Sequence, residues 1–331
     1  MRRREFIAGL GLVVTVSTIS TPGKAQHGTA NKRIPRIGIL WHAGNPEEEK
    51  EYLTVLTKAF SDLGYEDGKS VELLHRFPAE QPQKFRFFAE ELAAAKPDVL
   101  IAVTHIAAVE LKRATTSIPT VFILIQDPVE DGFVQSLSRP GGNMTGTSLM
   151  ASDLSGKRLS LMQEAIPGLR RVAMIFDFFG PSPSFVTAFQ NKAREMGLTV
   201  DPIQVLKPDD IEQAFSAIGS DGANAAFVVG PMLWNERRRV GMLSLRYKVP
   251  TCAIVAEMIP YGLLMSYGQD LPDYFRKAAA AAVKILKGAN PSDIPVEQPT
   301  RFKFVINVRA AKALGIAIPP AMLLSADEVI D

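Results

Sequence analysis

Residues 98–124 read DVLIAVTHIAAVELKRATTSIPTVFIL, and this stretch decides the fold class. Two continuously apolar runs, 98–103 and 119–124, flank a segment with helical periodicity over 106–114. Strands that are apolar at every position are typical of a parallel sheet whose two faces are both covered. A strand, a helix and a second parallel strand form a right-handed βαβ unit. The stretch therefore predicts an α/β protein with a parallel sheet between layers of helices.

The same alternation of apolar strands and amphipathic helices continues on both sides of this unit. Upstream, the sequence predicts strands over 36–41 and 71–75 and helices over 47–63 and 83–95. The rhythm restarts downstream, with strands predicted over 171–176, 199–205, 225–229 and 250–255 and helices over 184–196, 209–218 and 235–247. Each series holds enough apolar strands for its own core, which favours two doubly wound parallel-sheet lobes.

The remaining C-terminal segments are too few for a third domain. They comprise expected strands over 264–267 and 302–307 and expected helices over 272–286 and 308–314. We therefore assign residues 33–147 and 263–297 to the first lobe, and residues 148–262 and 298–331 to the second. The chain then crosses between the lobes more than once and forms a hinge. Ligands of open α/β sheets bind beyond the carboxyl ends of the strands, so a cleft shared by the two lobes is the expected site.

Residues 1–26 read MRRREFIAGLGLVVTVSTISTPGKAQ, the pattern of an export signal that is cleaved near residues 25–26. Its apolar stretch over 6–19 is shorter than the roughly 20 residues that a membrane-spanning helix needs, so we expect removal rather than stable membrane insertion. Arg3 and Arg4 precede Phe6 as in twin-arginine signals, and an arginine-rich Sec signal is the alternative. The mature protein is then expected in the periplasm.

Charge and motifs narrow the functional classes. The formal net charge is +2, and the signal contributes four positive side chains and one negative, so subtracting its net +3 leaves −1 for the mature chain. That balance offers no support for nucleic-acid binding. The sequence lacks a P-loop, a dinucleotide-binding glycine pattern after the first strand and a nucleophile elbow, and its four histidines lack metal-site spacing. An exported enzyme is therefore the least favoured class.

The single cysteine, Cys252, is expected to be a small core residue.

Candidate ligand contacts are polar and aromatic residues that follow the predicted strands, because loops at strand ends carry the sites of α/β proteins. They are Trp41, His42, Thr104, His105 and Asp127 in the first series, and Asp177, Phe178, Met232, Trp234 and Glu257 in the second. Any one of them could equally be a turn-former or a helix cap. Together they suit a zwitterion with an apolar side chain. A carboxylate would bind its ammonium group, hydroxyl and backbone N–H groups its carboxylate, and aromatic rings its side chain.

Several motifs resemble one protein family in order along nearly the whole mature chain. They lie at residues 60–68 (FSDLGYEDG), 112–119 (KRATTSIP), 127–129 (DPV), 138–146 (SRPGGNMTG), 155–159 (SGKRL), 262–268 (GLLMSYG), 295–300 (PVEQPT), 311–315 (AKALG) and 326–330 (ADEVI). The chain resembles the ABC-transporter substrate-binding proteins related to tryptophan- and tyrosine-binding ones.

The resemblance implies a two-lobed periplasmic binding protein, type I-like, without catalysis or a cofactor, whose partners are a membrane permease and its ATPase. Asp127 matches the family's Asp-Pro-Val motif, and Thr104 stands where members often have a small or hydroxyl residue. The sequence departs from the family pattern at residues 102–106 (AVTHI) and 256–262 (AEMIPYG), both at predicted cleft positions. The resemblance therefore leaves the ligand open between amino acids and related carboxylates. An extracytoplasmic sensor for a membrane signalling receptor is the alternative function.

Overall fold

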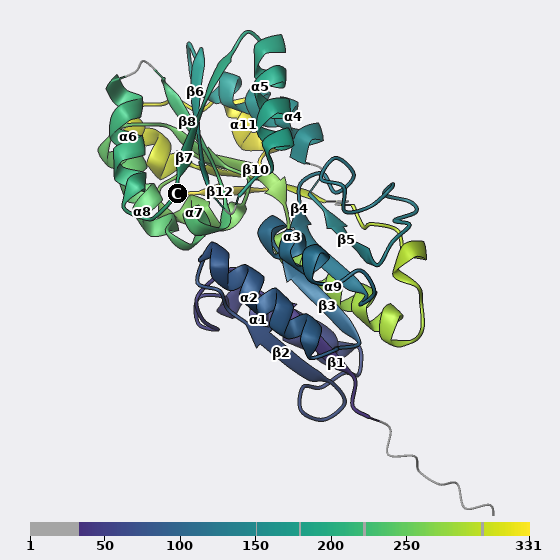
Figure 1. Cartoon of the computed structure of the whole chain (residues 1–331). Helices are drawn as coiled ribbons and strands as arrows, with labels where there is room; N and C mark the ends of the chain where they lie inside the picture. Colours follow the sequence, from purple (N-terminus) through teal and green to yellow (C-terminus); the bar gives the residue numbers. More distant parts are fainter. Residues whose placement is uncertain (1–32, 150, 179, 221–222, 299–300) are drawn as a thin grey trace, which may run out of the picture. The chain divides into compact units, whose positions relative to one another are not determined.

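The computed structural model describes residues 33–149, 151–178, 180–220, 223–298 and 301–331, and the predicted export signal lies outside these ranges. One compact unit spans Ile34–Asp331. Its helices and strands build two sheets, of five and seven strands, and helices cover both (Figure 1). Among the described helices, none combines the length and the apolar character that a bilayer span requires.

The first sheet is entirely parallel, with the strand order β2-β1-β3-β4-β5. Its strands are β1 (Arg36–Leu40), β2 (Glu72–Arg76), β3 (Val99–Val103), β4 (Thr120–Ile125) and β5 (Met144–Ser148). Its helices are α1 (Lys50–Asp62), α2 (Pro82–Ala94), α3 (His105–Ala114) and α9 (Leu271–Leu286). Alternate side chains of β3 divide between two apolar clusters: Ile101 packs in the one that holds residues of α1 and α9, and Leu100 in the one that holds residues of α2 and α3. Both faces of the sheet are therefore buried, as the continuously apolar strands predict.

The second sheet has the order β12-β11-β10-β9-β8-β6-β7 and is parallel except between β10 and β11. Its strands are β6 (Arg171–Asp177), β7 (Thr199–Val205), β8 (Ala225–Val229), β9 (Thr251–Ala253), β10 (Met265–Gln269), β11 (Phe302–Asn307) and β12 (Glu328–Ile330). The helices that accompany it are α4 (Ala151–Ala165), α5 (Pro183–Glu195), α6 (Asp210–Ser220), α7 (Pro231–Asn235), α8 (Arg237–Arg246), α10 (Val308–Leu314), α11 (Pro320–Ser325) and a 3-10 helix, η1 (Ala256–Tyr261). The predicted α/β class with mostly parallel sheets is confirmed.

Two details differ from the sequence-based expectation. Strand β5, with the sequence MTGTS, was not expected because it is polar, yet every residue in it is buried. One of its hydroxyls, Thr145 Oγ1, donates to the carbonyl of Ile294 at 2.7 Å, which satisfies a polar group that burial would otherwise leave unpaired. The helix expected over 235–247 is present as α8, and a short helix that the sequence did not predict, α7, precedes it and ends at Asn235.

The expected boundary at residue 263 is also wrong. Strand β10 pairs with β9 and β11 of the second sheet, whereas α9, which follows it, packs against β3, β4 and β5 of the first. The chain therefore passes from the second sheet to the first between Gln269 and Leu271. The apolar character of 264–267 could not distinguish the two sheets, because a central strand of either one is apolar.

Candidate functional site

A cavity of about 80 Å³ lies at the carboxyl ends of strands from both sheets. Residues of the first sheet and its helices that line it are His42, Glu49, Tyr52, Val103, Thr104, His105, Leu124, Gln126, Leu271 and Phe275. The segment that leaves β5 adds Leu149, and the second sheet adds Gly180, Val228, Val229, Gly230, Pro231, Trp234, Ile254, Val255 and Met258. Such a position is where ligands of open parallel sheets bind.

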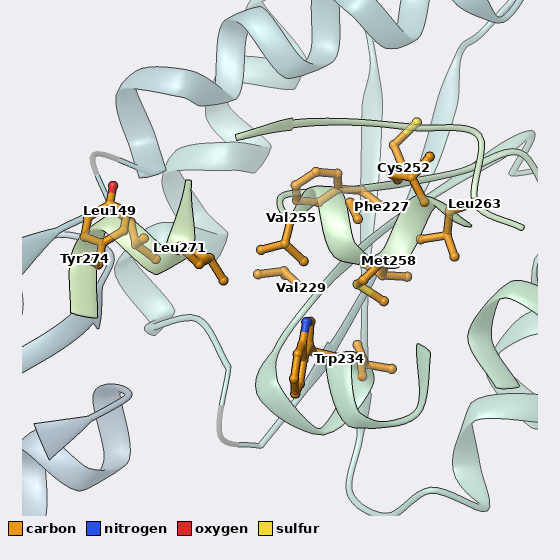
Figure 2. Packing of buried hydrophobic residues seen from close by; sticks show 14 of the residues in the cluster. Leu149, Phe227, Val229, Trp234, Cys252, Val255, Met258, Leu263, Leu271 and Tyr274 are labelled. Carbon is orange, nitrogen blue, oxygen red and sulfur yellow. The ribbon is translucent and has the colours of Figure 1, made fainter. Parts of the chain in front are cut away.

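The wall formed by the second sheet is apolar. Val229 ends β8, Val255 follows β9, and Met258 lies in η1. Figure 2 shows these three side chains close together, with the indole of Trp234 beside them. All four belong to one continuous cluster of buried apolar residues. This wall can hold an apolar side chain but offers few polar groups to orient a ligand.

Three aromatic rings link the two walls. Tyr52 of α1 stacks on Phe275 of α9, with ring centroids 4.8 Å apart and planes within 5°. Its ring also packs against Trp234 of α7, at 5.1 Å between centroids. Outside the cavity lining, the guanidinium of Arg237 lies 4.3 Å from the Trp234 ring centroid, a cation–π distance. The indole therefore contacts both an aromatic ring and a cation.

Two of the residues that line the cavity have strained backbone conformations. Thr104 has φ +91°, and Leu124 has φ +62° where the β4–β5 register shifts. Both are unfavourable for residues with a side chain, and such strain clusters at binding and catalytic sites. Gly230 has φ +144°, and a Cβ there would lie 2.2 Å from Asp177 Oδ2, so this position requires glycine. The bulge places Leu124 against the cavity, as β-bulges beside functional sites do.

The amino end of α3 forms one polar corner. Thr104 precedes the helix, is 5% exposed, and does not cap it with its side chain. Within the described residues, Thr104 Oγ1 and Gln126 Oε1 have no hydrogen-bond partner. The first N–H groups of a helix also lack partners within the helix, and the helix dipole favours an anion there. This corner suits a carboxylate.

A second polar corner holds His42 and Glu49, which are both buried. His42 Nε2 lies 3.2 Å from Glu49 Oε1, and His42 Nδ1 lies 3.6 Å from Glu80 Oε1. Burial by itself lowers the pKa of His42, but the carboxylates of Glu49, Glu80 and Asp177 outweigh it and raise that pKa above its usual value. The neighbouring carboxylates therefore stabilise the protonated imidazole relative to the neutral one.

A family model for ABC transporter substrate-binding proteins matches residues 47–330. The chain belongs to this family. It is 25% identical over 302 residues to a tyrosine-binding protein of Clostridioides difficile. The alignment covers 91% of this chain and 85% of the relative.

Solved structures show the same two-lobed arrangement of mostly parallel sheets, as in type I periplasmic binding proteins. One is an ABC domain from Streptococcus pneumoniae in complex with L-Trp, 26% identical, with a TM-score of 0.80, 89% of this chain covered and 99% of that one. A second, a conserved domain protein from Vibrio cholerae, is 23% identical, with a TM-score of 0.81, 90% of this chain covered and 100% of that one.

Two groups of polar contacts join the lobes of this substrate-binding protein. Asn235 Nδ2, at the end of α7, donates to Glu80 Oε1 at 2.8 Å. Ser184 Oγ, on α5, donates to Asp131 Oδ1 at 3.3 Å, and His105 Nε2 lies 3.6 Å from Asp131 Oδ2. Burial lowers the pKa of His105, an effect that Asp131 partly offsets, and burial raises the pKa of Asp131. Separation of the lobes would break the Asn235–Glu80 and Ser184–Asp131 contacts, whereas His105 and Asp131 both belong to the first lobe.

Four of the predicted contacts line the cavity: His42, Thr104, His105 and Trp234. Trp41 lies behind it, where Nε1 donates to His75 Nδ1 at 3.0 Å and the indole stacks on Phe275 at 6.0 Å between centroids. This buried ring supports the aromatic cluster from the side away from the cavity.

The other five predicted contacts are not among the lining residues. Asp177 is buried, and its Oδ2 accepts from the Leu233 N–H at 3.2 Å, which positions α7. Met232 is buried in the core, Phe178 is 48% exposed, and Asp127 is half-buried in the loop after β4. Glu257 borders a separate surface depression, and burial raises its pKa. Whether any of the ten residues contacts a ligand stays a prediction.

The sequence-based set missed Glu49, Tyr52 and Phe275. Glu49 belongs to the run EEEKE at 47–51, a pattern that usually indicates a solvated face. The spacing could have indicated that Glu49 is buried, because Glu49 lies three residues before the buried Tyr52 and so shares the inward face of α1. Phe275 comes from a helix far along the chain, and local sequence contains no information that places it here. The lone Cys252 is 3% exposed in β9, as expected, and burial raises the pKa of its thiol.

Proposed function

We propose that this protein captures an amino acid or a related carboxylate in the cavity between its lobes and delivers it to the membrane permease of an ABC importer. The observation that carries this proposal is the lining of one cavity by the strand ends of both sheets. A site divided in this way couples occupancy to the approach of the lobes, which a permease can recognise. The ligands named for the relatives, tyrosine and L-Trp, support an amino acid. The protein acts as a binder rather than an enzyme.

The ligand's carboxylate would bind at Thr104 and the first turn of α3, and its apolar side chain would lie against Val229, Val255 and Met258. The cavity volume of about 80 Å³ limits what fits in this conformation. An engineered apolar cavity of about 150 Å³ binds benzene, so an aromatic amino acid would need a wider separation of the lobes than this conformation has. A ligand small enough for the present cavity would leave the contacts Asn235–Glu80 and Ser184–Asp131 in place.

A thermal-shift screen of amino acids, aromatic acids and small carboxylates tests this proposal directly. A ligand that binds only the folded state adds about 2.7 kcal/mol of stability at a hundredfold excess over its dissociation constant. We expect at least one amino acid to raise the melting temperature and to give a saturable heat in calorimetry. A panel in which no compound shifts the transition would contradict the proposal.

Export is the second part of the proposal. Residues 1–26 would direct the chain across the inner membrane, by the twin-arginine route in preference to Sec, and would be removed near residues 25–26. Fractionation of the producing cells, followed by N-terminal sequencing, measures both the compartment and the cleavage point. Recovery of the uncleaved chain from the cytoplasm alone would contradict a periplasmic location.

A further inference from the structure

We propose that Glu49 is the acceptor for an ammonium group of the ligand, so that the protein binds amino acids and rejects the corresponding carboxylic acids that lack an amine. This inference rests on the proposed function and narrows its ligand class. From the sequence alone, the candidate carboxylates for an ammonium group are Asp127, Asp177 and Glu257. The geometry points to a different residue, because Glu49 alone among the carboxylates of the described residues lines the cavity.

One oxygen of Glu49 is engaged and the other is not. Oε1 accepts from the backbone N–H of Ala43 at 3.2 Å and lies 3.2 Å from His42 Nε2. Oε2 has no hydrogen-bond partner in the described part of the chain, although the residue is 0% exposed. A buried carboxylate oxygen without a donor is costly, and a ligand N–H group would remove that cost.

The hydroxyl of Tyr52 supplies a second acceptor in the lining of the same cavity. Glu49 and Tyr52 are three residues apart at the start of α1, a spacing that brings side chains together on one face of a helix. Tyr52 OH also has no hydrogen-bond partner among the residues described. An ammonium group has three N–H donors and prefers charged and hydroxyl oxygens, so this pair of oxygens matches it.

The charges around this corner have the sign that an ammonium requires. Within the described residues, neither lysine nor arginine lines the cavity. His42 is in contact with Glu49, and the charges of Glu49, Glu80 and Asp177 act on its imidazole, while Arg237 acts on Tyr52 from outside the lining. The corner therefore carries an excess of negative charge, which attracts a cation and repels a second carboxylate. The α3 corner, with Thr104, has the opposite preference, and the two corners together fit a zwitterion.

Matched ligand pairs measure this selectivity in the unmodified protein. The pairs are L-tyrosine with 3-(4-hydroxyphenyl)propionate, L-tryptophan with indole-3-propionate, and L-leucine with 4-methylpentanoate, with benzoate as a further acid. We expect calorimetry to give each bound amino acid an affinity at least about 30-fold above that of its amine-free partner, since removing one member of a buried charge pair typically has an effect of that size or more.

Glu49→Gln keeps the shape of the side chain and the oxygen that accepts from Ala43, but it removes the charge. We expect this variant to lose at least about 30-fold in amino-acid affinity and to bind the amine-free acids no more weakly than the parent protein. Glu47→Gln is the matched control, because Glu47 belongs to the same acidic run and its side chain is 79% exposed. It should leave the affinity ratio unchanged.

Equal affinity for an amino acid and its amine-free partner would overturn this inference while leaving the proposed function intact. The inference would also be overturned if Glu49→Gln left the ratio of amino-acid affinity to amine-free-acid affinity unchanged. Failure of every amino acid and acid in the wider screen would instead count against the proposed function. If Glu49→Gln does not fold, as judged by circular dichroism, Tyr52→Phe provides a second test, because it removes only the hydroxyl and should lower the same ratio.

Discussion

The two walls of the cavity differ in chemistry, although both are built from the carboxyl ends of parallel strands. The first-sheet wall carries the titratable and hydroxyl side chains His42, Glu49, Tyr52, Thr104 and His105. The second-sheet wall is lined by glycine, proline, aliphatic residues, a methionine and one tryptophan. The difference indicates a division of roles: the first lobe orients the polar part of a ligand, and the second excludes water and holds the apolar part.

The largest expected effect concerns the aromatic support of the polar wall. Phe275 is fully buried and stacks on both Tyr52 and Trp41. Phe275→Ala should lower the free energy of unfolding by about 3–5 kcal/mol, because it removes a large ring from a packed core and leaves a cavity. Urea denaturation followed by fluorescence measures the loss.

Phe87→Ala is the control for that substitution, because Phe87 is 62% exposed on α2. It should change stability by less than about 0.5 kcal/mol. Similar stabilities for the two variants would mean that the ring stack does not hold the polar wall in place. The proposed division of roles between the two walls would then have no support from the packing.

A smaller effect is expected at the contact that joins the walls. Asn235→Ala removes the donor to Glu80, whose other ion-pair partner is His42. We expect amino-acid affinity to fall by about 1.5–3 kcal/mol, the range for a hydrogen bond to a charged group, because the closed arrangement loses a contact that the open one does not make. Small-angle scattering should show a larger radius of gyration at the same ligand concentration. An unchanged affinity would show that closure depends on the apolar wall alone.

Much of this architecture could be predicted from sequence because parallel strands buried on two faces have an unmistakable composition. The runs at 98–103 and 171–176 each become a strand, β3 and β6, within a residue of the expected bounds. Strand β5 could not be found in the same way, because it is polar, and the partner of its Thr145 hydroxyl, the carbonyl of Ile294, comes from a segment far along the chain.

The site was predictable only where it follows a strand directly. His42, Thr104, His105 and Trp234 lie just beyond strand ends, and each of them lines the cavity. Glu49 lies within an acidic run that has no local mark of burial, and Phe275 arrives from α9 only after the chain has crossed from the second sheet. Local sequence predicts which loops meet at a cavity, whereas distant packing decides which of their side chains are buried.

Thr104 tests whether the polar wall stores strain for binding. At φ +91° glycine is far less strained than threonine, so Thr104→Gly should raise the free energy of unfolding, by about 1 kcal/mol. The same change removes the unpartnered hydroxyl beside α3, so amino-acid affinity should fall by about 1 kcal/mol. In this one variant, denaturation should therefore show a higher free energy of unfolding, and calorimetry should show a weaker amino-acid affinity. If stability and affinity fall together, Thr104 serves folding rather than binding.

The smallest expected effect is the pH dependence contributed by His42. Its neighbours Glu49, Glu80 and Asp177 raise its folded-state pKa above the ordinary 6.5. A raised pKa means that the folded state binds the proton more tightly than the unfolded state does. The stabilisation is therefore complete below about pH 6.5 and is lost as the pH rises through the folded-state pKa. His42→Gln should flatten the decline in unfolding free energy between pH 6.5 and 8.5, measured by urea denaturation in buffers of equal ionic strength.

His75 provides the contrast, because burial lowers its pKa and its contribution to stability is lost as the pH falls. A slope that His42→Gln leaves intact would show that the acidic corner does not hold a charged imidazole, and the polar wall would then carry a greater excess of negative charge toward the ligand.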